Sequence, residues 1–123
     1  MTNLSASFTE LLNYLDQSVK DYRYHFDNVH LKDKEIQDHL HEIEFTDYAD
    51  DHEAAKATFK VQASRRERRA SKDAVEVLEP LVDYLASKDG ARAFNQSKEV
   101  LGKMRQKEKN QQTRAYRKRV EQS

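Results

Sequence analysis

A repeat of apolar residues at alternating spacings of four and three constrains the fold of this chain more than any other feature. The repeat has eleven positions, of which Asp33 is the one polar member. The other ten positions are Phe8, Leu12, Leu15, Val19, Tyr22, Phe26, Val29, Ile36, Leu40 and Ile43. Such a repeat forms one apolar stripe along a helix and is typical of coiled coils. The sequence therefore predicts an all-α fold whose first helix covers about residues 8–44.

Two features bear on the limits of this first helix. Ser7 and Glu10 have the spacing of a capping box, with Ser7 as the N-cap. Asp33 either ends the helix and caps a new one, or lies in a continuous helix as a polar position. No Asn, Gly or Pro stands beside Asp33, so the sequence favours a continuous helix.

The composition supports a helical protein. Two Gly and one Pro in 123 residues are too few for a turn-rich β-sandwich or barrel. The absence of Cys excludes disulfides, thiolate zinc sites and a Cys nucleophile. Because apolar runs reach only two or three residues, no membrane span or signal peptide is visible. We therefore expect a cytoplasmic protein that does not contact membranes.

A second helix is predicted over about residues 47–86, with Thr46 or Asp47 as its N-cap. Pro80 either kinks this helix or restarts it, because proline lacks a backbone donor. The residues of this helix that are predicted to pack against a neighbouring helix form its contact line. The four-and-three spacing of this line slips by one residue after its first four members. The line consists of Tyr48, His52, Ala55, Phe59, Ala63, Ala70, Ala74, Val77, Leu81 and Tyr84.

The clearest break in the chain is the segment Ser87-Lys88-Asp89-Gly90. It predicts a third helix from Asp89 or Gly90 to residue 104 or beyond, with Phe94, Leu101 and Met104 on one face. The predicted architecture is a long helical hairpin or three-helix coiled-coil-like bundle over residues 1–104. Residues 105–123 are predicted to form a basic C-terminal arm, either as a frayed helix or as a disordered segment.

The net charge of zero conceals an uneven distribution. Residues 1–62 contain six Lys and Arg against thirteen Asp and Glu, whereas residues 98–123 contain nine against three. The acidic half and the basic tail either attract each other or serve two different partners. A neutral chain can therefore still bind nucleic acid, because the relevant charge is local.

Two groups of residues are candidates for binding nucleic acid or a nucleic-acid-associated protein complex. The first is a cationic stripe predicted to lie on the second helix opposite Ala63 and Ala70, formed by Arg65, Arg68, Arg69 and Lys72. A solvated face paired with acids of the first helix is the competing interpretation. The second group is in the arm, where cations would neutralise phosphates while an aromatic ring stacks on an unpaired base. Its members are Arg114, Tyr116, Arg117, Lys118 and Arg119.

Catalysis is not expected from this sequence. The carboxylate pairs Glu35 with Asp38 and Asp47 with Asp50 lack the flanking pattern of a magnesium site, and the zinc motifs His-x-x-Glu-His and His-Glu-x-x-His are both absent. We therefore predict no enzyme activity, no metal, no cofactor and no small-molecule substrate. The apolar repeat of the first helix could instead close on the second helix or pair with another copy, giving a homo-oligomer.

Several segments resemble small uncharacterised proteins of phages and prophages of Gram-positive bacteria. The resemblance is carried by residues 33–44 (DKEIQDHLHEIE), the cluster Arg65–Arg69, Lys72-Asp73 and Glu79-Pro80-Leu81. It implies a small phage product inside an infected cell, such as an accessory protein of DNA metabolism, a modulator of transcription or an inhibitor of host defence. It assigns no functional residue.

Three functions follow as hypotheses. The first is a non-enzymatic protein that binds nucleic acid, or a complex that processes it, through the basic stripe and arm. The second is an anti-CRISPR-like inhibitor of a host nuclease or defence complex, whose acidic helices occupy a basic groove. The third is a self-associating coiled-coil scaffold.

Overall fold

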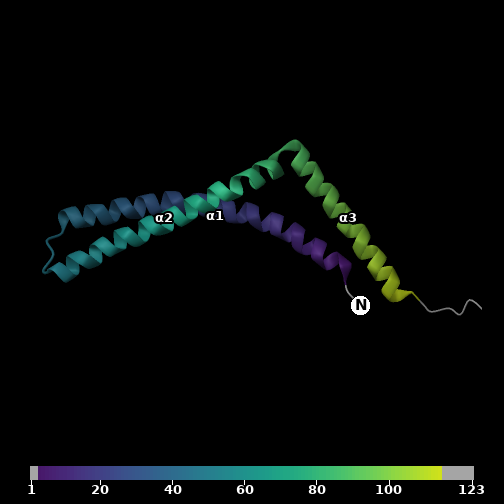
Figure 1. Cartoon of the computed structure of the whole chain (residues 1–123), viewed down its shortest axis with the longest axis horizontal. Coiled ribbons are helices and arrows are strands. Elements are labelled where there is room, and N and C mark those ends of the chain that lie inside the picture. The colour runs from purple at the N-terminus through teal and green to yellow at the C-terminus, as the bar shows by residue number, and fades with distance from the viewer. Residues whose placement is uncertain (1–2, 115–123) are drawn as a thin grey trace, which may run out of the picture. The chain divides into compact units, whose positions relative to one another are not determined.

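The computed structural model describes residues 3–114, and this part of the chain consists of three α-helices joined by short connections (Figure 1). Their bounds are Leu4–Phe45 for α1, Asp51–Ala86 for α2 and Lys88–Thr113 for α3. No strand occurs among the described residues. The predicted all-α class with three helices is therefore confirmed.

The helices form two compact units. One unit is a hairpin of residues 17–83, in which the second part of α1 runs antiparallel to α2. The other unit combines the start of α1, up to Asp16, with the segment from Tyr84 onward, which contains α3. Each unit is therefore built on one pair of helices.

The helix α1 is continuous through Asp33, as predicted. It begins at Leu4, so the prediction of Ser7 as its N-cap is wrong. The amide of Ser5 donates instead to the Glu108 carboxylate, at 3.1 Å. A carboxylate is favourable at a helix N-terminus, where amides lack partners within the helix. Glu108 lies 103 residues away from Ser5 in the chain, so no local sequence motif predicts this contact.

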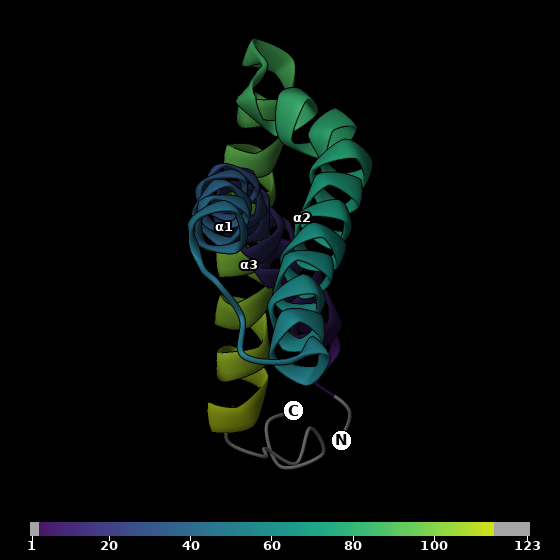
Figure 2. The same cartoon turned by 90° about the vertical axis from the view of Figure 1, so that its left-hand side faces the viewer.

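The loop of residues 46–50 links α1 to α2 in the hairpin (Figure 2). The amide of Glu53 donates to the Asp50 carboxylate at 2.9 Å, which satisfies an orphan donor of the first turn of α2. Thr46 and Asp47 were predicted as N-caps, and this prediction is wrong, because α2 starts at Asp51. The helix then continues through Pro80 without a restart.

The contact line of α2 differs from the predicted one. Its buried members are Ala57, Val61, Ser64 and Ser71. Arg68 occupies the position of the same repeat between Ser64 and Ser71 and is half-buried. These positions follow a regular spacing of four and three without the predicted slip. Ala63 and Ala70 are exposed. Apolar periodicity identified the wrong line, because two serines and an arginine occupy the true one.

The contact line of α1 also departs from the apolar repeat within the hairpin. Ile36 is buried, but Phe26 and Leu40 remain 46% and 37% exposed. The half-buried side chains of this stretch include the apolar Val29 and several polar ones: His25, Asn28, Lys32 and Glu35. The hairpin is therefore held by a mixed polar and apolar line, and Phe26 and Leu40 of the apolar repeat lie at its exposed edge.

In the other unit, α3 carries the predicted face of Phe94, Leu101 and Met104, which are all at least half-buried. The helix starts one or two residues before the predicted positions, at Lys88, with Ser87 as its N-cap. The Ser87 hydroxyl accepts from the Gly90 amide at 3.0 Å. The helix extends to Thr113, so the first residues of the basic C-terminal segment are helical.

Candidate functional site

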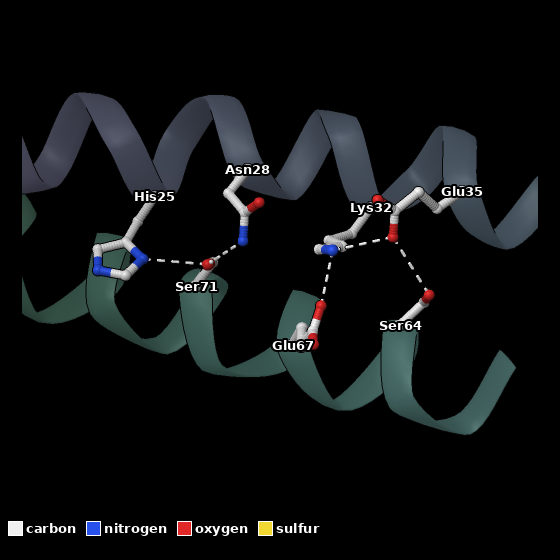
Figure 3. A network of polar contacts seen from close by, with 7 residues as sticks. All are labelled: His25, Asn28, Lys32, Glu35, Ser64, Glu67 and Ser71. Atoms are coloured by element: carbon white, nitrogen blue, oxygen red, sulfur yellow. Dashed lines mark hydrogen bonds and ion pairs between the residues drawn. The ribbon is translucent and has the colours of Figure 1, made fainter. Parts of the chain in front are cut away.

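A network of charged side chains lies in the middle of the hairpin (Figure 3). The Lys32 Nζ of α1 lies 2.9 Å from Glu35 Oε2 on its own helix and 2.6 Å from Glu67 Oε2 on α2. The Ser64 hydroxyl donates to Glu35 Oε2 at 3.3 Å. The Lys32 side chain is only 16% exposed, so both carboxylates compensate a charge that water reaches poorly.

The network shifts the ionisation of two of its members. The Glu67 carboxylate and then Glu35 accept hydrogen bonds from Lys32, and they raise the pKa of its ammonium above the ordinary 10.5. The same ammonium lowers the pKa of Glu35 below 4.5, with help from the Ser64 hydroxyl. Both groups are therefore charged at neutral pH.

A second polar cluster lies two turns away along the hairpin (Figure 3). The Asn28 amide donates to the Ser71 hydroxyl at 2.8 Å, and His25 Nδ1 lies 3.0 Å from the same oxygen. Ser71 is buried, so these bonds satisfy a group that would otherwise cost free energy. Polar contacts of this kind fix the register between two helices.

These polar clusters do not assemble a catalytic or metal site. Among residues 3–114, no three His, Asp or Glu side chains come together in a way that could hold a metal ion. Each polar group of the two clusters is engaged with the facing helix rather than presented to a cavity. We interpret both clusters as structural contacts that hold α1 against α2.

The predicted cationic stripe is divided by the structure. Arg68 lies on the contact line, where its Nε donates to the Asp33 carboxylate at 2.5 Å. Its side chain is 33% exposed, and that of Asp33 is 51% exposed. Arg68 therefore joins α2 to α1, which matches the competing interpretation for this one residue. Arg65, Arg69 and Lys72 are exposed.

Three arginines gather on one flank of α2 and form what we call the arginine patch: Arg65, Arg66 and Arg69. They line a single open depression, and no described carboxylate forms an ion pair with any of them. The rest of the depression is uncharged and consists of Thr58, Phe59, Val61 and Gln62. A patch of positive charge that is not paired with acids attracts anions.

Arg65 and Arg69 also border a second depression, next to Asp33 and Arg68. There the single carboxylate is already paired with Arg68. The arginine patch thus continues toward α1 without meeting a free acid in the described hairpin. Guanidinium forks in this arrangement suit bidentate contacts with phosphate or carboxylate.

The structure describes only two of the other predicted binding residues, Lys72 and Arg114. Lys72 is exposed but lines neither of these depressions. Arg114 follows α3 directly as its C-cap residue and is exposed. Tyr116, Arg117, Lys118 and Arg119 lie outside the described residues. The structure therefore brings together Arg65 and Arg69 of the predicted set.

Sequence reasoning missed five residues of the depression: Thr58, Phe59, Val61, Gln62 and Arg66. Phe59 was assigned to the contact line, yet it is 64% exposed. Arg66 was not part of the predicted cationic stripe. A signal was present in the sequence, because each of the four uncharged members precedes an arginine by seven residues: Thr58 and Arg65, Phe59 and Arg66, Val61 and Arg68, Gln62 and Arg69. Residues seven apart share a helix face.

The second unit contains a further group of polar contacts between α1 and α3. Glu108 accepts from the Ser5 amide, and hydrogen bonds from Ser5 lower the pKa of its carboxyl below 4.5. Arg105 donates to the Thr9 hydroxyl at 2.9 Å. Both contacts anchor the start of α1, so we assign them to the architecture of this unit.

Comparisons with known proteins do not extend this picture. No family model, curated protein or solved structure matches the chain. None of the helices in the described range is long and apolar enough to cross a membrane. The candidate function therefore depends on the chemistry of the arginine patch.

Proposed function

We propose that this protein binds nucleic acid, without catalysing a reaction, through the arginine patch of α2. The observation that carries the proposal is the exposure of Arg65, Arg66 and Arg69 around one depression that contains no carboxylate. Elsewhere in the hairpin, Lys32 forms an ion pair with Glu67 and Arg68 forms one with Asp33. Around this depression, three arginines without a described ion pair keep positive charge available.

The spacing of the patch suits a phosphate backbone. Arg65 and Arg69 are one helical turn apart, which is about 6 Å along the axis. Each guanidinium can donate two parallel hydrogen bonds to one phosphate. Arginine contacts to phosphates release counterions and supply affinity that does not depend on sequence. The basic C-terminal segment, with nine Lys and Arg among residues 98–123, would add to this affinity.

The proposal is tested by fluorescence anisotropy of labelled oligonucleotides with the full chain. Combined replacement of Arg65, Arg66 and Arg69 by Gln is expected to weaken binding by about tenfold or more at roughly 50 mM salt. The matched control replaces Lys20, Lys60 and Arg92 by Gln. It removes the same charge from exposed positions outside the patch, and we expect it to weaken binding only slightly.

Equal losses in both variants would show that net charge, and not the patch, determines binding. No binding by the unchanged protein would reject the proposal. The acidic α1 would then favour the inhibitor hypothesis, in which the partner is a protein with a basic groove. Circular dichroism of each variant establishes that the helices are intact.

Self-association is a second candidate, favoured by a different observation. Phe26 and Leu40 belong to the apolar repeat of α1, yet they are 46% and 37% exposed along one edge of the hairpin. An apolar edge of this kind is typical of an interface. Sedimentation equilibrium tests this candidate: a dimer that dissociates in the combined Phe26→Gln and Leu40→Gln variant supports it, and a monomeric unchanged protein rejects it.

A further inference from the structure

Phe59 is the one large apolar side chain that is exposed within the arginine patch depression. It is 64% exposed, although α2 offers contact-line positions to other residues only two places away, at Ala57 and Val61. No ring contact or cation–π contact of the described residues involves Phe59. The Phe59 side chain is therefore largely accessible to a ligand.

The position of this ring relative to the arginines is set by the helix. Phe59 and Arg66 are seven residues apart and share one face of α2, at a separation of about 10 Å along the axis. Gln62 lies between them and lines the same depression. A ligand along this flank would meet an aromatic ring at one end, an amide in the middle and guanidinium groups at the other.

The combination matches one class of ligand. Each nucleotide of a single strand has an anionic phosphate and a base with a flat, partly apolar face. In a duplex, the faces of the bases are stacked inside and cannot reach a side chain on a rigid helix. Stacking of unpaired bases on aromatic side chains beside a positively charged surface is how many proteins hold single strands.

A protein helix fits the same surface less well. Helix-in-groove binding uses several apolar anchors at intervals of three or four residues. Here Phe59 is followed on its own flank by Gln62 and Arg66, and the neighbouring Val61 is buried in the hairpin. One exposed ring among arginines provides a single anchor, which is enough for one base but not for an amphipathic helix.

We infer that the arginine patch binds single-stranded nucleic acid in preference to duplex, with one unpaired base stacked on Phe59. This inference rests on the proposed function and adds the class of ligand and the residue that selects it. The arginines hold phosphates in either form of nucleic acid. The phenyl ring contributes only when a base is free to leave its own stack.

The direct probe is the Phe59→Trp variant. The chain has no other Trp, so its fluorescence reports on position 59 alone. Addition of an unlabelled single strand of about 15 nucleotides is expected to quench this fluorescence, because a stacked base contacts the indole. The matching duplex is expected to bind with little quenching. Absence of quenching when anisotropy shows that the single strand is bound would overturn the inference.

The Phe59→Ala variant measures the energetic effect. Loss of one stacked base predicts a decrease of roughly 5- to 150-fold in affinity for the single strand, with a change of less than about twofold for the duplex. The control is Phe45→Ala, which removes a phenyl ring that is 80% exposed outside the depression. It is expected to leave both affinities unchanged.

The outcomes separate the inference from the function on which it rests. Loss of binding in the arginine variant with no effect of Phe59→Ala keeps nucleic-acid binding and overturns the stacking inference. Equal decreases for single strand and duplex overturn it as well. Absence of binding to any oligonucleotide rejects both. Displacement of the bound single strand by polyglutamate at matching charge concentration would overturn the inference in favour of an acidic protein ligand.

Discussion

The ammonium of Lys32 lies 2.6 Å from the carboxylate of Glu67 and connects α1 to α2 in the middle of the hairpin. Lys32 stands in the half-buried line between the helices, where an apolar residue would be usual. Its charge is compensated by Glu67 and Glu35 together. Lys32 thus holds two carboxylates in place as well as connecting two helices. Removal of Lys32 would leave Glu35 and Glu67 facing each other.

Replacement of Lys32 by Met is therefore expected to destabilise the hairpin. Met keeps the length of the aliphatic chain but removes the charge, so Glu35 and Glu67 lose their common partner and repel each other. Thermal unfolding followed by circular dichroism should give a lower Tm for this variant. The control is Lys34→Met at an exposed neighbouring position, for which we expect almost no change. Equal Tm values for the two variants would contradict the structural role of Lys32.

The contact between Glu108 and Ser5 predicts a dependence of stability on pH. The pKa of Glu108 is lowered below 4.5 by hydrogen bonds from Ser5. Its contribution to stability is therefore fully present above pH 4.5 and is lost as the pH falls through the lowered pKa. The Glu108→Gln variant should have a lower Tm than the unchanged protein at about pH 7, and this difference should shrink toward about pH 3.

The control for this prediction is Glu99→Gln, an exposed glutamate on the same helix. Its Tm should follow that of the unchanged protein across the whole pH range. A constant difference between Glu108→Gln and the unchanged protein at all pH values would show that the carboxylate does not anchor α1.

The two glycines of the chain are predicted to respond in opposite directions to alanine. A Cβ at Gly90 would lie 1.7 Å from the Tyr84 carbonyl oxygen, so the turn between α2 and α3 would have to rearrange. A Cβ at Gly102 would meet no atom within 4 Å, and alanine there favours the helix by about 1 kcal/mol. Urea unfolding should show a loss of stability for Gly90→Ala and a gain for Gly102→Ala. A gain for both would contradict the geometry of the turn.

The ion pair between Asp33 and Arg68 predicts a change in binding. Replacement of Asp33 by Asn releases Arg68 beside the arginine patch and removes the carboxylate of the second depression. We expect the affinity for a single strand to increase by several-fold, as one more cation becomes available. The control is Asp38→Asn, which removes the same charge from an exposed position on α1. If both variants increase the affinity equally, the effect is one of net charge alone.

The helices could be predicted from the sequence because the signals for them are local. The apolar repeat of α1 and the scarcity of glycine and proline indicate long helices, and Asp33 leaves α1 unbroken as expected. Phe94, Leu101 and Met104 also mark the buried face of α3 correctly. Each of these inferences depends on residues within a few turns of one another.

The pairing of the helices was harder to predict, because polar residues make it. Ser64, Arg68 and Ser71 occupy the contact line of α2, and each is satisfied by a residue of α1. A polar side chain shows its partner only once both helices are placed. The same holds for Ser5 and Glu108, which are distant in the chain. Because the contact line of α2 was predicted wrongly, Phe59 was assigned to the interface between the helices and was not considered as a binding residue.

The salt dependence of single-strand binding tests the central claim most directly. Affinity is measured by anisotropy from roughly 50 to 200 mM salt for the unchanged protein and for the variant with Gln at positions 65, 66 and 69. Each phosphate contact contributes about 0.7 to the slope of log affinity against log salt on a single strand. Three arginine contacts therefore predict a slope that is shallower by about two in the variant. Equal slopes for the two proteins would contradict the account, because they would mean that the arginine patch does not touch the phosphates.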